Sequence, residues 1–223
     1  MAKQDDARRY AEMKREMVKG TFSGEAPSTL ERGPDTKSRD LSGLKVAVIV
    51  SDGFEQAEFD GPVRALKDAG AVVEVLAEDA EHLERSRGVN HLDPAPGTRG
   101  HKQIGQVSQQ DYDMLLVPGG AVSPDTMRQS EAHLQLVKAF FDAHKPVAMI
   151  CHGPWLLADA ELAKGRRLTS WPGIKRDLER AGAEWVDQKV VVDDTLITSR
   201  KPADIQAFSE AILTVLSARK AAR

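Results

Sequence analysis

The chain has 223 residues and a mass of 24.4 kDa, which is enough for one sizeable hydrophobic core or two small domains. Its formal net charge of -3 and its pI near 6.1 provide no global basic field for a phosphate backbone, so we expect no nucleic-acid partner. The apolar runs are far shorter than the roughly 20 residues of a membrane-spanning helix, and residues 1–20 lack the apolar region of a secretory signal. We therefore expect no membrane partner. The single cysteine excludes an intrachain disulfide and favours a reducing, cytoplasmic setting.

The first forty residues differ in composition from the rest of the chain. They are rich in charged side chains and poor in large apolar ones, with helical spacing over residues 5–19 and an extended connection over residues 20–40. We interpret residues 1–43 as an N-terminal arm that lies on the domain or on a partner subunit, or that is disordered. Residues 44–218 form the predicted domain, and residues 219–223 form a C-terminal tail.

Strand and helix signals alternate along the predicted domain. Continuous aliphatic runs predict buried strands, and apolar residues at helical spacing predict helices. Residues 80–110 are polar and predict short hairpin-like strands or a loop. The expected strands are 45–50, 72–76, 114–117, 147–150, 190–192 and 196–198, and the expected helices are 57–69, 131–143, 153–162, 174–181 and 205–216. This alternation predicts a parallel or mixed sheet between two layers of helices.

Three of the predicted strand ends carry residues that suit chemistry. In an open α/β sheet, ligands bind at the carboxyl ends of the strands. The three ends read VSDGFE over residues 50–55, VPGG over residues 117–120 and ICHGP over residues 150–154. We therefore expect a functional site that is assembled from these three turns.

Cys151 is the strongest candidate for a catalytic residue. A buried strand leads directly into it, and helical sequence begins at Gly153, which is the strand–turn–helix setting of a nucleophile elbow. The dipole and the N–H groups of a following helix favour a thiolate. The turn that contains Gly119 and Gly120 would bring backbone N–H groups to an oxyanion near the sulfur. The alternatives are a buried cysteine that merely ends a strand and an ordinary glycine turn.

The ordered set of motifs resembles the DJ-1/PfpI superfamily. The set consists of Glu55 after the first strand, the Pro-Gly-Gly turn, and the segments AMICHGP, TSWPGIK and SRKPAD at residues 148–154, 169–175 and 199–204. The likeness covers about residues 44–218 and is closest to the PfpI branch of intracellular-protease-like and general stress proteins. It implies a flavodoxin-like three-layer α/β sandwich with a mostly parallel central sheet and helices on both faces. It also implies a homo-oligomer, a dimer or hexamer, with the site near the subunit interface.

The resemblance further implies roles for single residues. Cys151 matches the family nucleophile, and His152 matches the adjacent histidine. Glu55 matches the carboxylic acid beside the sulfur, where burial and a neighbouring thiolate would keep it protonated. The alternatives are a surface glutamate in the first turn of a helix for Glu55, and a loop histidine that acts only through its backbone N–H for His152.

Backbone and cross-subunit groups complete the implied site. The N–H groups of Gly120 and His152 match the oxyanion donors of the family. Asp125 falls where the PfpI branch has an acid that reaches the histidine across a subunit contact. Its alternative is an N-cap at the start of a short helix.

No residue pattern indicates a cofactor or a metal. His82, His91 and His101 are nine and ten residues apart in a polar stretch, which is more typical of surface histidines than of a metal site. The Pro-Gly-Gly turn lacks the Lys-Ser/Thr partner of a phosphate loop. No histidine follows His152, which argues against glutamine amidotransferases of class I and papain-like proteases.

We expect a cytoplasmic stress-response protein whose Cys151 nucleophile acts on a small carbonyl compound or on a peptide. The first would be a glyoxalase- or deglycase-like reaction with methylglyoxal-type aldehydes, and the second the hydrolysis of amide bonds by an intracellular cysteine peptidase. A sensor of oxidative stress or a chaperone, non-catalytic and operating through Cys151 oxidation, is the alternative. The residues of the site do not choose among these functions.

Overall fold

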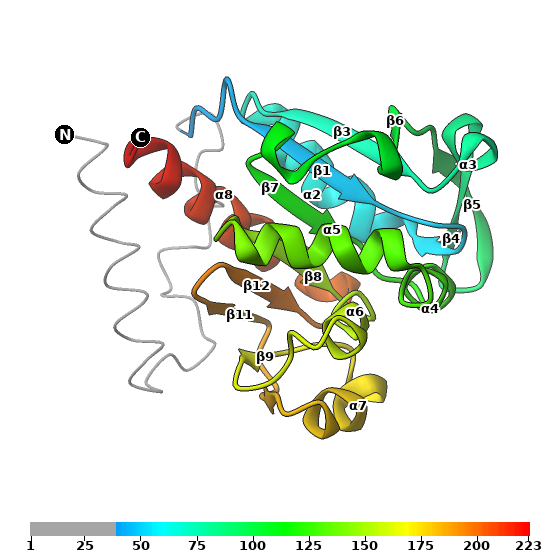
Figure 1. The fold of residues 1–223 in the computed structure, drawn as a ribbon, viewed down its shortest axis with the longest axis vertical. Helices are drawn as coiled ribbons and strands as arrows, with labels where there is room; N and C mark the ends of the chain where they lie inside the picture. The colour runs from blue at the N-terminus through cyan, green and yellow to red at the C-terminus, as the bar shows by residue number, and fades with distance from the viewer. Residues whose placement is uncertain (1–38) are drawn as a thin grey trace.

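A seven-stranded sheet forms the centre of the computed structural model, which describes residues 39–223 (Figure 1). Its neighbouring strands are parallel except for the antiparallel pair β11–β12. In spatial order the strands are β11 (Val190–Asp193), β12 (Leu196–Ser199), β8 (Val147–Ile150), β7 (Met114–Val117), β1 (Lys45–Ile49), β3 (Val72–Ala77) and β6 (Lys102–Gln103). The predicted three-layer α/β sandwich with a mostly parallel sheet is confirmed.

Two small sheets lie beside the central one. The first contains β2 (Phe54–Glu55), β4 (Ser86–Asn90) and β5 (Asp93–Thr98), in which β4 and β5 form an antiparallel hairpin. The second pairs β9 (Arg167–Leu168) with β10 (Glu184–Trp185).

Helices connect the strands and cover both faces of the sheet. The α-helices are α2 (Gln56–Asp68), α3 (Ala80–Glu84), α4 (Val122–Met127), α5 (Glu131–Asp142), α6 (Trp155–Asp159), α7 (Lys175–Arg180) and α8 (Ile205–Ala221). Short 3₁₀ turns are η3 (Ile104–Gln106), η4 (Gln109–Asp111), η5 (Pro172–Ile174) and η6 (Pro202–Asp204).

The sheet separates two hydrophobic cores because successive strand residues point to opposite faces. In β1, Val46 and Val48 enter the core under α2 and α8, whereas Ala47 and Ile49 enter the core under α5 and α6. In Figure 1, α5 crosses the face of the sheet that is turned toward the viewer. Burial on both faces explains why the strands are continuous aliphatic runs.

The structure departs from the expected elements in a few places. Helix α4 was not among the expected helices, and α6 is shorter than the predicted helix at 153–162. Helix α8 continues to Ala221, beyond the predicted domain end at residue 218. Leu41, from the predicted arm, is fully buried, and its N–H donates to Ala69 O at 2.7 Å. The expected helix over residues 5–19 and most of the arm lie outside the described residues.

The predicted strand ends meet at one edge of the sheet. Strands β1, β7 and β8 are adjacent and parallel, so the segments that follow them leave the sheet side by side. Over residues 39–223, no helix has both the length and the apolar character needed to cross a membrane.

Candidate functional site

Cys151 occupies a strained turn directly after β8. Its φ of 63° lies in the left-handed region, which side chains other than glycine rarely adopt. The turn is held from both sides, since the Cys151 N–H donates to Ser199 O at 3.1 Å and the Trp171 N–H donates to Cys151 O at 2.8 Å. The cysteine is 7 % exposed. The predicted strand–turn–helix elbow therefore exists, and it holds the sulfur at the edge of the core with a small part accessible.

The glycine turn after β7 lies against the cysteine. Gly120 has a φ of 87°, and a Cβ at this position would overlap Gly53 O. A Cβ at Gly119 would lie only 2.5 Å from the Cys151 Cβ. Only glycine fits at these two positions, because the backbone passes so close to its neighbours.

Glu58 is the carboxyl group beside the sulfur. It is fully buried in the first turn of α2, and its Oε2 accepts the Gly119 N–H at 3.1 Å. The same Oε2 atom would collide with a Cβ at Gly119, so this glycine has the Glu58 carboxyl on one side and Cys151 on the other. Its Oε1 is buried with no regular hydrogen-bond partner among the described residues. A proton on Oε1 would therefore be available to the sulfur or to a substrate oxygen.

Burial controls the protonation of this acid. Burial, together with the neighbouring Glu55 carboxylate, raises the pKa of Glu58 to about 8, although the thiol and the N–H groups of Gly119 and Gly120 act in the opposite direction. At neutral pH the carboxyl group is thus mostly protonated. The sequence predicted a neutral carboxylic acid beside the sulfur, and the structure has one, but it is Glu58 rather than Glu55.

The thiol is subject to opposing influences. Burial raises the pKa of the Cys151 thiol, and an ionised Glu58 raises it further. The backbone N–H groups of Gly120 and His152 lower it, which indicates that both face the sulfur. The N–H groups therefore act in the direction expected from the sequence, but the desolvation of the sulfur has the larger effect on the pKa of the thiol. A protonated Glu58 removes the unfavourable charge.

His152 contacts the sulfur through its ring. Its Nδ1 lies 3.3 Å from the Cys151 Sγ, a contact that consecutive side chains seldom make. The ring is flanked by Trp155 and Trp171, with ring centroids at 5.5 and 6.0 Å. Burial lowers the pKa of His152, so the ring is neutral at pH 7 and has one nitrogen that can accept a proton.

The motifs of this site and the sequence as a whole point to one family. The sequence profile of the DJ-1/PfpI family matches residues 44–215. The chain belongs to this family. It is 39 % identical over 175 residues to general stress protein 18 of Bacillus subtilis, covering 78 % of this chain and 98 % of that protein. It is 38 % identical over 175 residues to protein/nucleic acid deglycase 2 of Escherichia coli, again covering 78 % and 98 % of the two chains.

Solved structures of the DJ-1/PfpI family have the same fold. The crystal structure of Drosophila melanogaster DJ-1beta superposes with a TM-score of 0.71 at 27 % sequence identity. The superposition covers 80 % of this chain and 92 % of that one. The resemblance that the sequence motifs indicated is thereby confirmed.

Glu55 does not lie where the family resemblance placed it. Its Oε2 accepts the backbone N–H of His91 at 2.9 Å, from the turn between β4 and β5. Glu55 belongs to β2, which pairs with β4, and this pairing turns its side chain toward the hairpin. Helix α2 begins one residue later and carries Glu58 toward the sulfur instead. The two acids are three residues apart, and only the start of the helix distinguishes them.

Asp125 is also separate from the sulfur within this chain. It is exposed in α4, where it lies inside the helix rather than at its N-cap. Among the described residues, no contact joins the Asp125 carboxylate to His152. The role across a subunit contact therefore remains a prediction.

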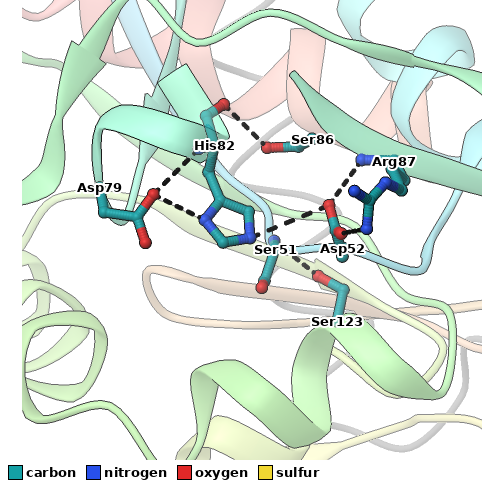
Figure 2. Close-up of polar contacts among 7 residues, drawn as sticks. All are labelled: Ser51, Asp52, Asp79, His82, Ser86, Arg87 and Ser123. Atoms are coloured by element: carbon teal, nitrogen blue, oxygen red, sulfur yellow. Dashed lines mark hydrogen bonds and ion pairs between the residues drawn. The ribbon is translucent and has the colours of Figure 1, made fainter. Parts of the chain in front are cut away.

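Polar contacts hold the loop after β1 in place (Figure 2). The Ser51 N–H donates to Ser123 Oγ of α4 at 2.9 Å. The Asp52 carboxylate accepts the backbone N–H of Arg87 at 2.7 Å and pairs with its guanidinium at 2.9 Å. In the same view His82 lies between Asp79 and Asp52, with its Nδ1 2.8 Å from Asp79. These contacts join the loop to α4 on one side and to β4 on the other.

A metal centre finds no support in the side chains that the structure describes. Within residues 39–223, no three or more His, Cys, Asp or Glu side chains are grouped so that they could hold a metal ion. His82 and His91 contact different carboxylates, Asp79 and Glu55.

Proposed function

We propose that the protein uses Cys151 as a nucleophile against the carbonyl carbon of small reactive aldehydes of the methylglyoxal class, or of their early adducts on amines. The observation that carries this proposal is the strained turn at Cys151, which holds the sulfur next to two backbone N–H donors and a neutral carboxylic acid. Such an arrangement suits a reaction in which negative charge develops on a carbonyl oxygen. The name of the Escherichia coli deglycase is consistent with this chemistry.

The proposed first step needs no oxidant or cofactor. The thiol proton passes to His152 Nδ1, 3.3 Å from Sγ, as the sulfur attacks the carbonyl carbon. A C–S bond forms, and the π electrons of the carbonyl move to its oxygen, which accepts hydrogen bonds from the N–H groups of Gly120 and His152. Glu58 then gives its proton to that oxygen and yields a hemithioacetal.

The burial of the sulfur favours a small substrate. With Cys151 only 7 % exposed, an aldehyde of a few atoms reaches the sulfur more easily than a peptide amide does. Amide hydrolysis is therefore our second expectation for the catalytic chemistry, and the assay below includes it.

A second candidate function is the sensing of oxidants through Cys151. Glu58 Oε1, which has no hydrogen-bond partner within residues 39–223, favours it, because a protonated carboxyl donates a hydrogen bond to an oxidised sulfur as readily as to a substrate oxygen. The name of the Bacillus subtilis relative, a general stress protein, suits either function.

We also propose a cytoplasmic homo-oligomer. The lone cysteine is consistent with a reducing compartment. The exposed Asp125 is available to the histidine of a neighbouring subunit, since no contact among the described residues engages its carboxylate within the site of its own chain.

The consumption of methylglyoxal tests this proposal. Cys151→Ala is expected to lower the rate of consumption by about 100-fold or more, because the nucleophile is lost. Gln135→Ala, an exposed change on α5, serves as the control and keeps the full rate. Full activity in Cys151→Ala would contradict the proposal. A wild-type protein that is inert toward methylglyoxal and peptide amides, yet forms a stable sulfenate or sulfinate at Cys151 with peroxide, would support sensing instead.

A further inference from the structure

Residues 167–171 lie beside the ends of the central strands and lead to the Cys151 turn. They begin with β9 and end at Trp171, whose backbone N–H binds the Cys151 carbonyl. We propose that Thr198 is a positioning residue: its buried hydroxyl fixes this segment, and the segment holds Cys151 in its strained turn. This inference deepens the proposed function and rests on it, since it names a residue that aims the proposed nucleophile.

Side chains attach the first part of the segment to the central sheet. The Arg167 N–H donates to Asp193 Oδ2 of β11 at 3.0 Å, and the Thr169 N–H donates to Thr198 Oγ1 of β12 at 3.0 Å. Both donors point at the central sheet, as alternate residues of an extended chain do. Strand β9 itself pairs with β10. The Asp193 and Thr198 side chains therefore join the small β9–β10 sheet to the central one.

Thr198 lies where this segment and the Cys151 turn meet. Its neighbour Ser199 accepts the Cys151 N–H at 3.1 Å, and the Trp171 N–H donates to Cys151 O at 2.8 Å. Two segments thus hold the two main-chain groups of Cys151, and the Thr198 hydroxyl joins these segments to each other. A left-handed backbone at a residue other than glycine persists only when its surroundings hold it. The Thr198 hydroxyl therefore supports the conformation of the nucleophile.

The hydrogen bond between Thr169 and Thr198 is fully buried. Neither residue has any exposed surface, so water cannot replace the Thr198 hydroxyl as an acceptor. Without that hydroxyl the Thr169 N–H would be buried and unsatisfied, which is costly. The segment would shift to satisfy this N–H, and the Trp171 N–H would lose its alignment with Cys151 O.

Such a shift would reach both groups of the proposed proton transfer. Trp171 contacts Cys151 through its backbone, and its ring stacks on the His152 ring with centroids 6.0 Å apart. The His152 Nδ1 in turn lies 3.3 Å from the Cys151 Sγ. A misplacement of about 1 Å in a reacting group can lower a rate by about 100-fold. The position of the segment should therefore affect the rate of attack more than the binding of a small aldehyde.

The first test is amide hydrogen exchange, followed by NMR on ¹⁵N-labelled protein. Thr198→Val replaces the hydroxyl by a methyl group of similar size. We expect the Cys151 and Trp171 amides to exchange about 10-fold faster, while the amides of β1, which pairs with β3 and β7, keep their wild-type rates. Thr198→Ser keeps the hydroxyl and should restore slow exchange.

The matched control is the same change in helix α8. The Thr214 hydroxyl donates to Glu210 O at 2.8 Å, so Thr214→Val also removes a hydrogen-bonded hydroxyl. It should leave the exchange of the Cys151 and Trp171 amides at the wild-type rates.

Steady-state kinetics with methylglyoxal provide the second test. Thr198→Val is expected to lower kcat by about 10-fold and to leave KM close to that of the wild type, because the substrate still reaches the sulfur but the attack geometry is lost. Thr198→Ala removes the same hydroxyl without placing a methyl group in its position and should behave alike. The outcome thus does not depend on the folding of one variant.

Unchanged exchange of the Cys151 and Trp171 amides in both variants would overturn the inference. Equal acceleration of the β1 amides would also overturn it, since Thr198 would then stabilise only the fold as a whole. So would an unchanged kcat in a variant with faster local exchange. The exchange measurement needs no substrate: if it changes as expected while the wild type does not consume methylglyoxal, the proposed function fails and the hold of Thr198 on the turn stands. If Cys151→Ala abolishes consumption while local exchange is indifferent to Thr198, only the role of Thr198 fails.

Discussion

His133 is a buried histidine whose titration should make the stability of this fold depend on pH. It is fully buried in α5, and neither ring nitrogen has a hydrogen-bond partner among the described residues. Burial lowers the pKa of His133 to about 4. The charge of His82 lowers this pKa further, whereas the charge of Glu78 raises it. In the unfolded chain a histidine titrates near pH 6.5. The unfolded state therefore binds the proton first as the pH falls.

The stability of the protein is expected to fall between about pH 6.5 and pH 4. The contribution of a neutral buried His133 is complete above pH 6.5 and is lost as the pH falls toward 4, amounting to about 3 kcal/mol of unfolding free energy for this one group. His133→Leu should flatten the pH dependence in urea titrations. His144→Asn, an exposed change at a left-handed position that asparagine tolerates, is the control and should keep the wild-type dependence. Equal pH dependence in His133→Leu and the wild type would show that another group is responsible.

Turns between the elements form the site, and the turn after β7 places the strictest limits on residue type. Gly120 combines a left-handed backbone with close approach of Gly53 O and of the Glu55 nitrogen. Gly165 has a similar φ of 76° but no atom within 4 Å of the place where a Cβ would lie. A comparison of alanine variants at Gly120 and Gly165 therefore separates the cost of backbone strain from the cost of steric overlap.

Gly120→Ala is expected to lower the unfolding free energy by about 3 kcal/mol, and Gly165→Ala by about 1 kcal/mol. Both variants place an alanine in a left-handed conformation, but only at position 120 does the new Cβ also overlap neighbouring atoms. Denaturant unfolding of the two variants measures the difference. Activity should fall in Gly120→Ala alone, since the turn carries an N–H that faces the sulfur. Equal destabilisation of both variants would mean that the turn relaxes to accept a side chain.

The sequence predicted the elements better than it predicted the contacts of the site. The aliphatic runs of β1, β7 and β8 stand out because these strands are buried on both faces. Helix α4 was foreseen only as the alternative in which Asp125 caps a short helix, because its six residues give a weak helical signal; it begins earlier, at Val122, with Pro124 in its first turn.

Within the site, the elbow at Cys151 could be predicted from the sequence because a strand, a turn and a helix follow one another along the chain. Glu58 was not, because Glu55 and Glu58 are both acids near a helix start and the brief pairing of β2 with β4 decides which one turns inward. The sequence left open whether His152 acts through its ring or only through its backbone N–H. In the structure its Nδ1 lies 3.3 Å from the Cys151 Sγ, and Cys151 itself has a left-handed backbone.

The whole molecule brings distant parts of the chain to one point. Glu58, Gly120 and Cys151 follow three strands that are neighbours in the sheet but far apart in the sequence. Two hydrophobic cores support these strands, one on each face. The proposed site at this edge is thus held by the packing of the described domain, so the polar groups around the sulfur should lose little freedom if a substrate binds there.

The most direct test is a ¹³C NMR spectrum of the wild-type protein mixed with ¹³C-labelled methylglyoxal. A bond between the Cys151 sulfur and the aldehyde carbon should give a protein-bound hemithioacetal resonance that is absent in Cys151→Ala. The resonance should be weakened in Glu58→Ala, which lacks the acid proposed to protonate the alkoxide oxygen. An identical spectrum for the wild type and Cys151→Ala would show that the sulfur does not attack the carbonyl, and would contradict the nucleophilic role of this cysteine.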